Sequence, residues 1–559
     1  MIKYTIWDKT NIGENYPGIT SPLTYSFVRR SYQAVYKNFC LRIGVSPTEI
    51  REKNYIFENL VGHIHGQLYY NLRSWYELLS FLPGERQTST WFDTMLDPVV
   101  RRSIHEITDR KYSFPFRIYR IYIGVRFAIL SVLFPILRRE FDRKSSVLFS
   151  SGYSAHFSQM IDQELIGWFR VLEDRFLSVW AIPIINDFRL MVSYGMLVQA
   201  SRLWVSDPDE VLRRLSTYKS MPISVIILRD SQHIANMIRE TPLYFSLFQK
   251  TDATEVWKKL SHPSFRDLKY LIDAYLEQYG DRMANELKLE EPSFQENPIR
   301  FIELLKRYAK NKKIIQKDRT LFSETSKHWW QRLILYSLTR YVSDAMHQRE
   351  LFRLRRLQAF RVAKNVYLEC ARRFVNRKKL HTSQDIFFLT HDEIMDSALH
   401  PSLAGSLFSL VQKRKHIQSE YAKYILPQLV LTDSSGTIVR QKVQSKISVK
   451  KNRNLSGKPA SAGTREGEVV VMDTLDTKTD IAGKILITKT TDPGWTILFP
   501  LLSGVITQYG GMLSHAAIVA RELEIPCIVG VSGVTELLKS GDRIFMNGTT
   551  GEIHRLEKV

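Results

Sequence analysis

The chain has 559 residues, of which 44% are hydrophobic, 24% charged and 12% aromatic. These values exclude a disordered chain, a collagen and a small disulfide-bonded scaffold, and the length suits about three or four domains. The 79 Lys and Arg residues outnumber the 57 Asp and Glu residues, for a net charge of +22. Residues before Ser456 carry +24, whereas those from Ser456 onward carry −2. We therefore expect two parts with different roles.

The three cysteines, Cys40, Cys370 and Cys527, show no CxxC or CxxH spacing. This pattern supports neither a disulfide framework nor a structural zinc site, and it fits a reducing cytoplasm. The N-terminus lacks the layout of a secretory signal. The most apolar stretch, Ile121–Leu137, has 17 residues and contains Arg126, which predicts a buried helix and not a membrane span. We expect a soluble cytoplasmic protein.

Residues 25–425 carry apolar side chains at intervals of three and four and contain few glycines, a pattern typical of amphipathic helices. Together with the residues that flank it, this region is predicted to form a mainly helical domain over residues 1–431. The clearest helices are expected at Leu68–Phe81, Glu164–Ile182, Ser264–Gln278, Ile299–Ala309, His328–Asp344 and Leu351–Val375.

The pattern changes after this region. Residues 432–456 are polar and basic, which is typical of a surface linker or hairpin. Residues 457–559 contain short β-branched runs separated by glycine-containing turns. Strands are expected at Glu468–Met472, Lys484–Lys489, Gly504–Thr507, Cys527–Val531 and Arg543–Asn547, with a helix at Ser514–Leu523. The predicted fold class is multidomain α plus α/β, with a large mainly helical domain before a smaller C-terminal β/α domain.

One histidine of the C-terminal domain has a position suited to phosphate chemistry. After the strand Gly504–Thr507 come the turn glycines Gly510 and Gly511, then Ser514 as the N-cap, then His515 in the first helical turn. Backbone N–H groups at a helix N-terminus stabilise an anion, and a phosphoryl group on the imidazole would be such an anion. Glycines without Cβ also permit close approach of a nucleotide or a phosphorylated partner. The alternative is an ordinary surface or capping histidine.

The string GGMLSHAAIVARELEIPCIVG resembles the phosphohistidine signature of the phosphoenolpyruvate-utilising enzymes, which include phosphoenolpyruvate synthase and the rifampin phosphotransferases. Three flanking segments resemble the opening strands, the TDPGW-type loop and the closing hairpin of the same swivelling domain: Gly457–Val471, Leu486–Pro500 and Gly541–Ile553. The resemblance implies that His515 carries the phosphoryl group. It also implies that Gly510, Gly511, Ser514 and Arg521 belong to the phosphate site.

Two residues in or near this signature could have a purely structural role. Arg521 either holds a phosphate or forms an ion pair with Glu466 or Glu524. Cys527 follows a proline at the start of a strand, and we expect it to be a buried small side chain and not a nucleophile.

The helical region resembles the substrate-binding domain of rifampin phosphotransferases and related ligases at Trp7–Val28, Gly62–Leu72 and Asp385–Ile394. It also contains a string, starting at Arg349 and Glu350 and ending at Arg353, that resembles the R-E-x-x-K pattern of those enzymes, whose basic pair is implicated in transfer. Two cations four residues apart share a helix face and could clamp a phosphoryl group. An arginine at the second position keeps the charge but cannot act as a titratable base. The alternative is a solvated basic face.

Three further residues are weaker candidates. Glu14, within NIGENYPG, either positions substrate or caps the adjacent turn. His63 and His65 form an H-x-H pair that would place both rings on one side of a strand, as a metal site needs. No third ligand is spaced nearby, so we expect pocket lining or packing and no metal site.

The resemblance implies a split phosphotransferase. The chain begins where the family's ATP-grasp domain should end, contains no Walker-type loop, and stops before the barrel that binds pyruvate in the synthase. We expect a separate ATP-grasp protein to hold ATP and Mg²⁺ and to place the β-phosphate of ATP on His515, with release of phosphate and later AMP. The linker would then let the histidine domain reach a small-molecule acceptor in the helical domain.

Two alternatives stay open. The phosphoryl group could activate an oxygen that an amine then displaces, as in the prodigiosin-type ligases of this group. The chain could also be a basic, non-catalytic binding protein for a polyanion, although no recognised nucleic-acid-binding motif is present and its basic residues are scattered.

Overall fold

In the computed structural model the chain folds into two compact units. Unit 1 comprises Met1–Gly195, Leu287–Glu290 and Phe352–Ser445, and unit 2 comprises Met196–Glu286, Glu291–Leu351 and Lys446–Val559. The structure describes residues 5–81, 114–154, 156–205, 211, 223–282, 285–310, 328–400, 407–424, 426–433, 438–441, 455–472, 479–512 and 514–556.

Unit 1 contains a five-stranded antiparallel sheet in the order β2-β3-β1-β4-β5. The strands are β1 (Thr5–Asp8), β2 (Val61–Ile64), β3 (Gln67–Asn71), β4 (Leu429–Thr432) and β5 (Ile438–Gln441). Gly62 allows β2 to lie against Trp7, since a Cβ at this glycine would lie 2.3 Å from the indole ring. The sequence pattern did not predict this sheet.

The helix predicted at Leu68–Phe81 is partly wrong, because its first residues belong to this sheet. Leu68–Asn71 belongs to β3, and only Leu72–Leu79 forms a helix, α5. A short apolar run has the same composition in a buried strand and in a buried helix, so its periodicity does not separate the two. Asn71 marks the boundary, because its side-chain oxygen accepts the backbone N–H of Ser74.

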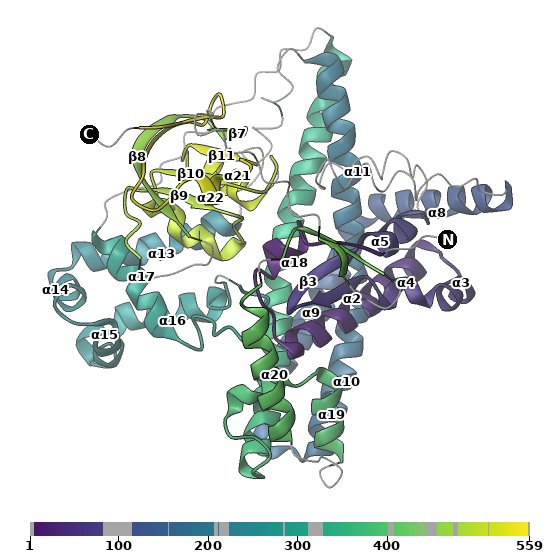
Figure 1. Ribbon diagram of the computed structural model, residues 1–559, viewed down its shortest axis with the longest axis horizontal. Helices are drawn as coiled ribbons and strands as arrows, with labels where there is room; N and C mark the ends of the chain where they lie inside the picture. The colour runs from purple at the N-terminus through teal and green to yellow at the C-terminus, as the bar shows by residue number, and fades with distance from the viewer. Residues whose placement is uncertain are drawn as a thin grey trace. The chain divides into compact units, whose positions relative to one another are not determined.

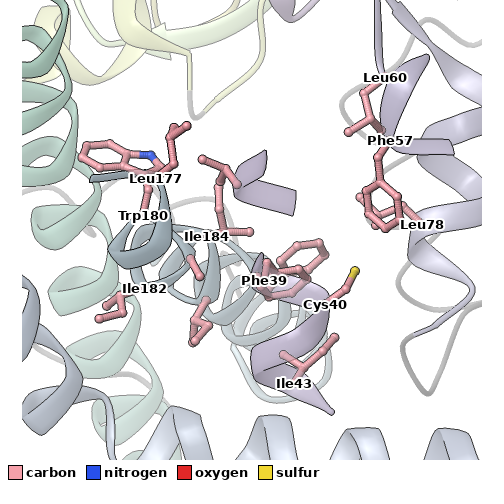
Figure 2. Close-up of a cluster of buried hydrophobic side chains, with 14 of the residues drawn as sticks. Phe39, Cys40, Ile43, Phe57, Leu60, Leu78, Leu177, Trp180, Ile182 and Ile184 are labelled. Atoms are coloured by element: carbon pink, nitrogen blue, oxygen red, sulfur yellow. The ribbon is translucent and has the colours of Figure 1, made fainter. Parts of the chain in front are cut away.

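The other helices of unit 1 surround an apolar core. They are α1 (Ile12–Asn15), α2 (Pro22–Ile43), α3 (Pro47–Glu52), α4 (Asn54–Glu58), α8 (Phe114–Val132), α9 (Phe134–Ser154), α10 (Asp162–Val179), α19 (His391–Leu399) and α20 (Leu407–Tyr421). In the core, α2 places Phe39, Cys40 and Ile43 among side chains from α4, α5, α10 and the segment that follows α10 (Figure 2). Phe39 stacks on Phe188 with ring centroids 4.9 Å apart.

Two long helices supply residues to both units: α11 (Ala181–Trp204) and α18 (Trp329–Asn376). The helices predicted at His328–Asp344 and Leu351–Val375 are one continuous element, α18. The residues between them, AMHQRE, include neither proline nor glycine, so nothing in the chain ends the helix there.

The sequence predicted a buried helix at Ile121–Leu137, but the structure shows most of this stretch exposed. This stretch spans the end of α8 and the start of α9, and seven of its large apolar residues, from Ile121 to Ile136, are exposed. The two helices together are apolar enough to cross a membrane but are bent by 69°. The segment Asp162–Trp204 is also long and apolar enough to cross a membrane. However, 72% of its most apolar stretch is buried inside the protein, as in the core helix of a folded domain.

Unit 2 combines helices with an eight-stranded sheet (Figure 1). Its helices are α13 (Ile223–Glu240), α14 (Pro242–Lys250), α15 (Ala253–Lys259), α16 (Arg266–Tyr279), α17 (Pro298–Lys310), α21 (His515–Glu522) and α22 (Val534–Leu537), with a 3-10 helix, η5 (Pro493–Leu501). Its strands are β6 (Leu455–Ser456), β7 (Lys458–Ser461), β8 (Thr464–Val471), β9 (Ile485–Thr488), β10 (Gly504–Thr507), β11 (Cys527–Val529), β12 (Arg543–Asn547) and β13 (Glu552–Arg555).

The sheet order is β6-β13-β12-β8-β9-β10-β11-β7, and β8 to β11 run parallel. The predicted C-terminal strands and the helix after β10 are confirmed. Of the predicted linker, residues 434–437 and 442–454 lie outside the described residues, and β4 pairs with β5 in antiparallel register. The domain boundaries at 431 and 457 stay a prediction.

Candidate functional site

His515 begins α21 at the carboxyl end of the parallel strands. β10 ends at Thr507, and Gly510 follows with φ +122°, a left-handed conformation that favours glycine. Ser514 is the N-cap residue, with φ −64° and ψ 157°. The first helical hydrogen bond runs from Ile518 N–H to the Ser514 carbonyl, so the N–H groups of residues 515–517 precede it. The predicted order of strand, glycine turn and helix is confirmed.

Hydroxyl groups from the loop before η5 and from η5 itself contact both ring nitrogens of His515. Thr491 Oγ1 lies 3.1 Å from Nδ1, and Thr496 Oγ1 lies 2.9 Å from Nε2. The edge of the Phe499 ring faces the imidazole, with centroids 6.1 Å apart. The ring is half-buried. It is therefore held in a defined orientation while part of it stays accessible.

Two buried hydroxyl groups lie close to the glycine turn. Within the described residues, Ser514 Oγ and Thr507 Oγ1 have no hydrogen-bond partner, so Ser514 does not cap α21 through its side chain. A Cβ on Gly510 would lie 3.1 Å from Ser514 Oγ and 3.7 Å from Thr507 Oγ1. Among the described residues, no atom would lie within 4 Å of a Cβ on Gly511. The turn thus carries hydroxyl groups and a glycine against which no described side chain packs.

Arg521 connects α21 to the glycine turn. Its Nε donates to the Ala517 carbonyl at 2.8 Å, and its Nη2 donates to the Met512 carbonyl. Glu466, one of the partners considered for it, forms an ion pair with Arg543 at 3.3 Å. These contacts tie the turn to the helix that carries His515.

Asp492 is a buried carboxyl group of the same loop that the sequence pattern did not single out. Its Oδ1 accepts the Gly494 N–H at 2.8 Å, which caps η5, and its Oδ2 accepts the Asn285 N–H at 3.0 Å. Burial, followed by the nearby charge of Glu286, raises the pKa of Asp492 to about 7. Glu286 itself pairs with Arg282 at 2.7 Å.

Thr491 and Thr496 were not predicted from the sequence either. The sequence did contain a signal that could have identified them, because both threonines and Asp492 lie inside the segment that resembles a TDPGW-type loop. Their approach to His515 nevertheless spans 19 to 24 residues of chain, and no local pattern encodes it.

The basic string on α18 consists of Arg349, Glu350 and Arg353, and its three side chains have different surroundings. Glu350 accepts hydrogen bonds from Ile223 N–H at 2.7 Å and from Ser224 Oγ at 3.3 Å, so it caps the N-terminus of α13. Arg349 and Arg353 are partly buried and one helical turn apart on α18. The structure thus gives Glu350 a definite structural role, whereas the transfer role of the two arginines stays a prediction.

The candidates of the N-terminal region lie in unit 1. Glu14 lies in α1. His63 stacks on Tyr25 with centroids 4.6 Å apart, whereas His65 lies in the turn after β2, with φ 42°, and stacks on Tyr421. Each histidine ring packs on a tyrosine, and because His65 lies beyond the end of β2, the two rings do not share a face of that strand. Across the described ranges, no group of three or more His, Cys, Asp or Glu residues could hold a metal ion.

Cys527, at the start of β11, is fully buried, and burial raises its pKa to about 12. The prediction of a buried small side chain is confirmed.

Comparison with protein families identifies two domains. Residues 481–551 match the mobile domain of PEP-utilising enzymes, and residues 188–361 match the fourth domain of rifampicin phosphotransferase. The first range contains His515 with Thr491, Asp492 and Thr496, and the second contains the basic string of α18.

Similarity to whole proteins points to the same family as these domain matches. The chain is 25% identical to rifampicin phosphotransferase of Bacillus cereus over 348 residues, which is 58% of this chain and 38% of that protein. It is 26% identical to the Streptomyces sviceus enzyme over 345 residues, with the same coverage. An uncharacterised Mycobacterium tuberculosis protein is 33% identical over 215 residues, or 38% of this chain and 24% of that protein.

A solved structure, Thermococcus kodakaraensis aconitase X in its holo-form, is 24% identical and covers 19% of this chain and 100% of its own, with a TM-score of 0.17. That score is too low to relate the two folds. The aligned region spans well under half the length of the curated rifampicin phosphotransferases. By these matches the chain is homologous to rifampicin phosphotransferases, with their fourth domain at residues 188–361 and the mobile domain of PEP-utilising enzymes at residues 481–551.

Proposed function

We propose that this protein is a phosphotransferase that carries a phosphoryl group on His515 from a separate ATP-grasp protein to a small-molecule acceptor. The observation that carries the proposal is the His515 imidazole at the N-terminus of α21, with a threonine hydroxyl at each ring nitrogen. The match of residues 481–551 to the mobile domain and the homology to rifampicin phosphotransferases support it.

The proposed chemistry has two transfers. In the first, a ring nitrogen of His515 takes the β-phosphoryl group of ATP, so that ATP is consumed to AMP and inorganic phosphate with the entry of one water. In the second, the acceptor oxygen attacks the phosphorus, the N–P bond breaks, the acceptor hydroxyl loses its proton, and the released ring nitrogen of His515 takes up one proton. The helix N-terminus stabilises the added negative charge, and the two threonines hold the ring in position.

ATP and Mg²⁺ are assigned to the partner, and no residue of this chain is assigned to either. We further propose that the histidine domain moves between the partner and the acceptor, with residues 432–456 as the pivot, and that the protein acts in the cytoplasm. A strongly basic region before Ser456 and a weakly acidic one after it would favour their docking.

The test is phosphorylation with ATP labelled at the β-phosphate. Alone, the protein should neither hydrolyse ATP nor become labelled. With a cognate ATP-grasp protein, acid-labile label should appear, and His515→Ala should abolish it. His554→Ala is the matched control, because His554 is also half-buried and lies in the same sheet region, stacked on Phe545.

Persistence of the label in His515→Ala, or its loss in His554→Ala alone, would contradict the assignment. Product analysis then defines the second transfer. A phosphorylated product supports phosphotransfer, whereas a product in which an amine has replaced the oxygen, with free phosphate released, would show the ligase chemistry.

A further inference from the structure

The outer face of α8, in unit 1, is an apolar surface left exposed. Six apolar side chains of this helix recur at intervals of three and four residues and so lie on one face: Ile118, Ile121, Tyr122, Val125, Ile129 and Val132. Their exposed fractions range from 48% to 79%. Isolated exposed apolar residues are normal in proteins, but a continuous stripe of this kind marks an interaction surface.

The stripe belongs to a helix that is firmly held. Ile123, on the opposite face of α8, is fully buried in the core. The Tyr119 hydroxyl accepts the Ser46 N–H at 2.9 Å, and Arg126 Nε donates to the Arg42 carbonyl at 3.0 Å. Arg126 also donates to the Tyr122 hydroxyl at 3.0 Å. The outer face is therefore a fixed surface of unit 1.

The start of α9, which follows a bend of 69° after α8, also has an exposed face, and this face is basic. Ile136 is 61% exposed, and Arg139 and Arg143 follow it at three and seven residues, both exposed and on the same face. Residues 114–154 contain seven basic and two acidic residues. An apolar stripe bordered by cations is the pattern of a helix that lies in the boundary between lipid headgroups and acyl chains.

The charge distinguishes among the possible occupants of this face. In a twofold dimer the same patch meets itself, so both halves of the interface would be basic and neither would supply an excess of acidic residues for Arg139 and Arg143. Residues 82–113 carry five acidic and five basic residues and offer no net negative charge. A surface of anionic lipid provides both an apolar layer and a complementary charge.

We propose that the outer face of α8 and α9 binds an anionic membrane surface, with the apolar stripe of α8 in the headgroup boundary and Arg139 and Arg143 against the lipid phosphates. This is binding along the surface and not a membrane span. It goes beyond the proposed function and does not depend on it.

The test is co-sedimentation of the full-length protein with vesicles of phosphatidylcholine alone or mixed with phosphatidylglycerol. Wild type should sediment with the mixed vesicles, and added NaCl should weaken the binding. The double variant Val125→Asp with Ile129→Asp should lose binding by about tenfold or more. Val171→Asp is the matched control, since this valine is 50% exposed on α10, compared with 56% for Val125; it should bind like wild type.

Circular dichroism checks that both variants are folded. Absence of wild-type sedimentation would overturn the proposal, as would equal binding of wild type and the double variant. A dimer detected by light scattering that Val125→Asp dissociates, without vesicle binding, would show that a second copy occupies the face. Vesicle binding that appears only after residues 82–113 are removed would show that this segment covers it, and would also overturn the proposal.

A second readout does not rely on loss of binding. Cys40, Cys370 and Cys527 are buried, so a thiol introduced as Ile129→Cys is accessible to an environment-sensitive dye. Its emission should shift to the blue on adding the mixed vesicles, whereas a dye at Val171→Cys should not respond. No shift at position 129 would contradict insertion of the stripe.

Discussion

The two threonines around His515 illustrate how single side chains set the geometry of this site. A phosphoryl acceptor must present its nitrogen in one direction, and a free imidazole rotates about two bonds. Hydroxyl contacts of 3.1 Å and 2.9 Å, at opposite ring nitrogens, restrict that rotation. Each threonine hydroxyl can donate to a bare ring nitrogen or accept from a protonated one, so the two contacts hold the ring in either neutral tautomer.

Thr496→Val should therefore slow phosphorylation of His515 by about tenfold, equivalent to about 1.4 kcal/mol of barrier. Thr496→Ser, which retains the hydroxyl, should recover most of the rate. The measurement is the initial rate of β-phosphate labelling with the ATP-grasp partner. Thr550→Val, at an exposed threonine of the same domain, serves as the control. Equal rates for the Val and Ser variants would show that the hydroxyl does not position the ring.

Asp492 should make the stability of unit 2 depend on pH. Its pKa rises from 3.8 to about 7 on folding, so the folded protein binds more protons than the unfolded chain between these values. The stabilising contribution of the protonated carboxyl is complete below pH 4 and is lost as the pH rises toward 7. The cause is burial, with the charge of Glu286 second.

Asp492→Asn cannot ionise, and its single carbonyl oxygen can accept only one of the Gly494 and Asn285 N–H groups, which the aspartate accepts on separate oxygens. The lost hydrogen bond lowers the melting temperature at every pH, whereas the absence of a titrating carboxyl raises it relative to wild type only at high pH, so the variant should compare more favourably with wild type at pH 8 than at pH 5. Thermal unfolding of both proteins at the two pH values measures this. A difference that does not change with pH would exclude a titrating Asp492.

Among the elements, the N-terminus of α2 depends on a short segment far away in sequence. Ser21 donates from its N–H and its hydroxyl to Glu290, at 2.9 and 2.7 Å, and Thr24 Oγ1 donates to Glu290 at 2.6 Å. Lys288 donates to the Ile19 carbonyl at 2.8 Å. The segment Leu287–Glu290 therefore fastens the loop before α2 within unit 1.

Glu290→Ala should lower the free energy of unfolding by about 2 to 3 kcal/mol, because it leaves three donors without their charged acceptor. Urea unfolding measures the change. Glu277→Ala, at an exposed residue of α16, should change stability by less than about 0.5 kcal/mol. Similar effects of both substitutions would show that the contacts of Glu290 contribute little.

Sequence periodicity predicted elements well where each was long or bounded by glycine turns. The strand at Gly504–Thr507 and the helix after it formed as expected, since turn glycines and an N-cap serine define their ends locally. It failed at Leu68–Asn71, a short run whose partner strands come from Thr5–Asp8 and Val61–Ile64.

At the scale of the whole molecule, the sequence by itself determined that a basic, helix-rich region precedes a β/α domain with a histidine at a helix start. Composition, turn residues and the motif around His515 are local properties, and local properties are read directly from the chain. It also indicated the family to which the chain proved homologous.

Only the tertiary structure decided which groups surround that histidine, which donors Glu350 and Glu290 accept from, and which apolar faces stay exposed. Thr496 reaches His515 across 19 residues, Glu290 reaches Ser21 across 269, and β1 pairs with a strand more than 400 residues away. Periodicity tells which side chains of a helix share a face. It does not tell what packs against that face, which is why α8 was expected to be buried and instead presents its apolar stripe to solvent.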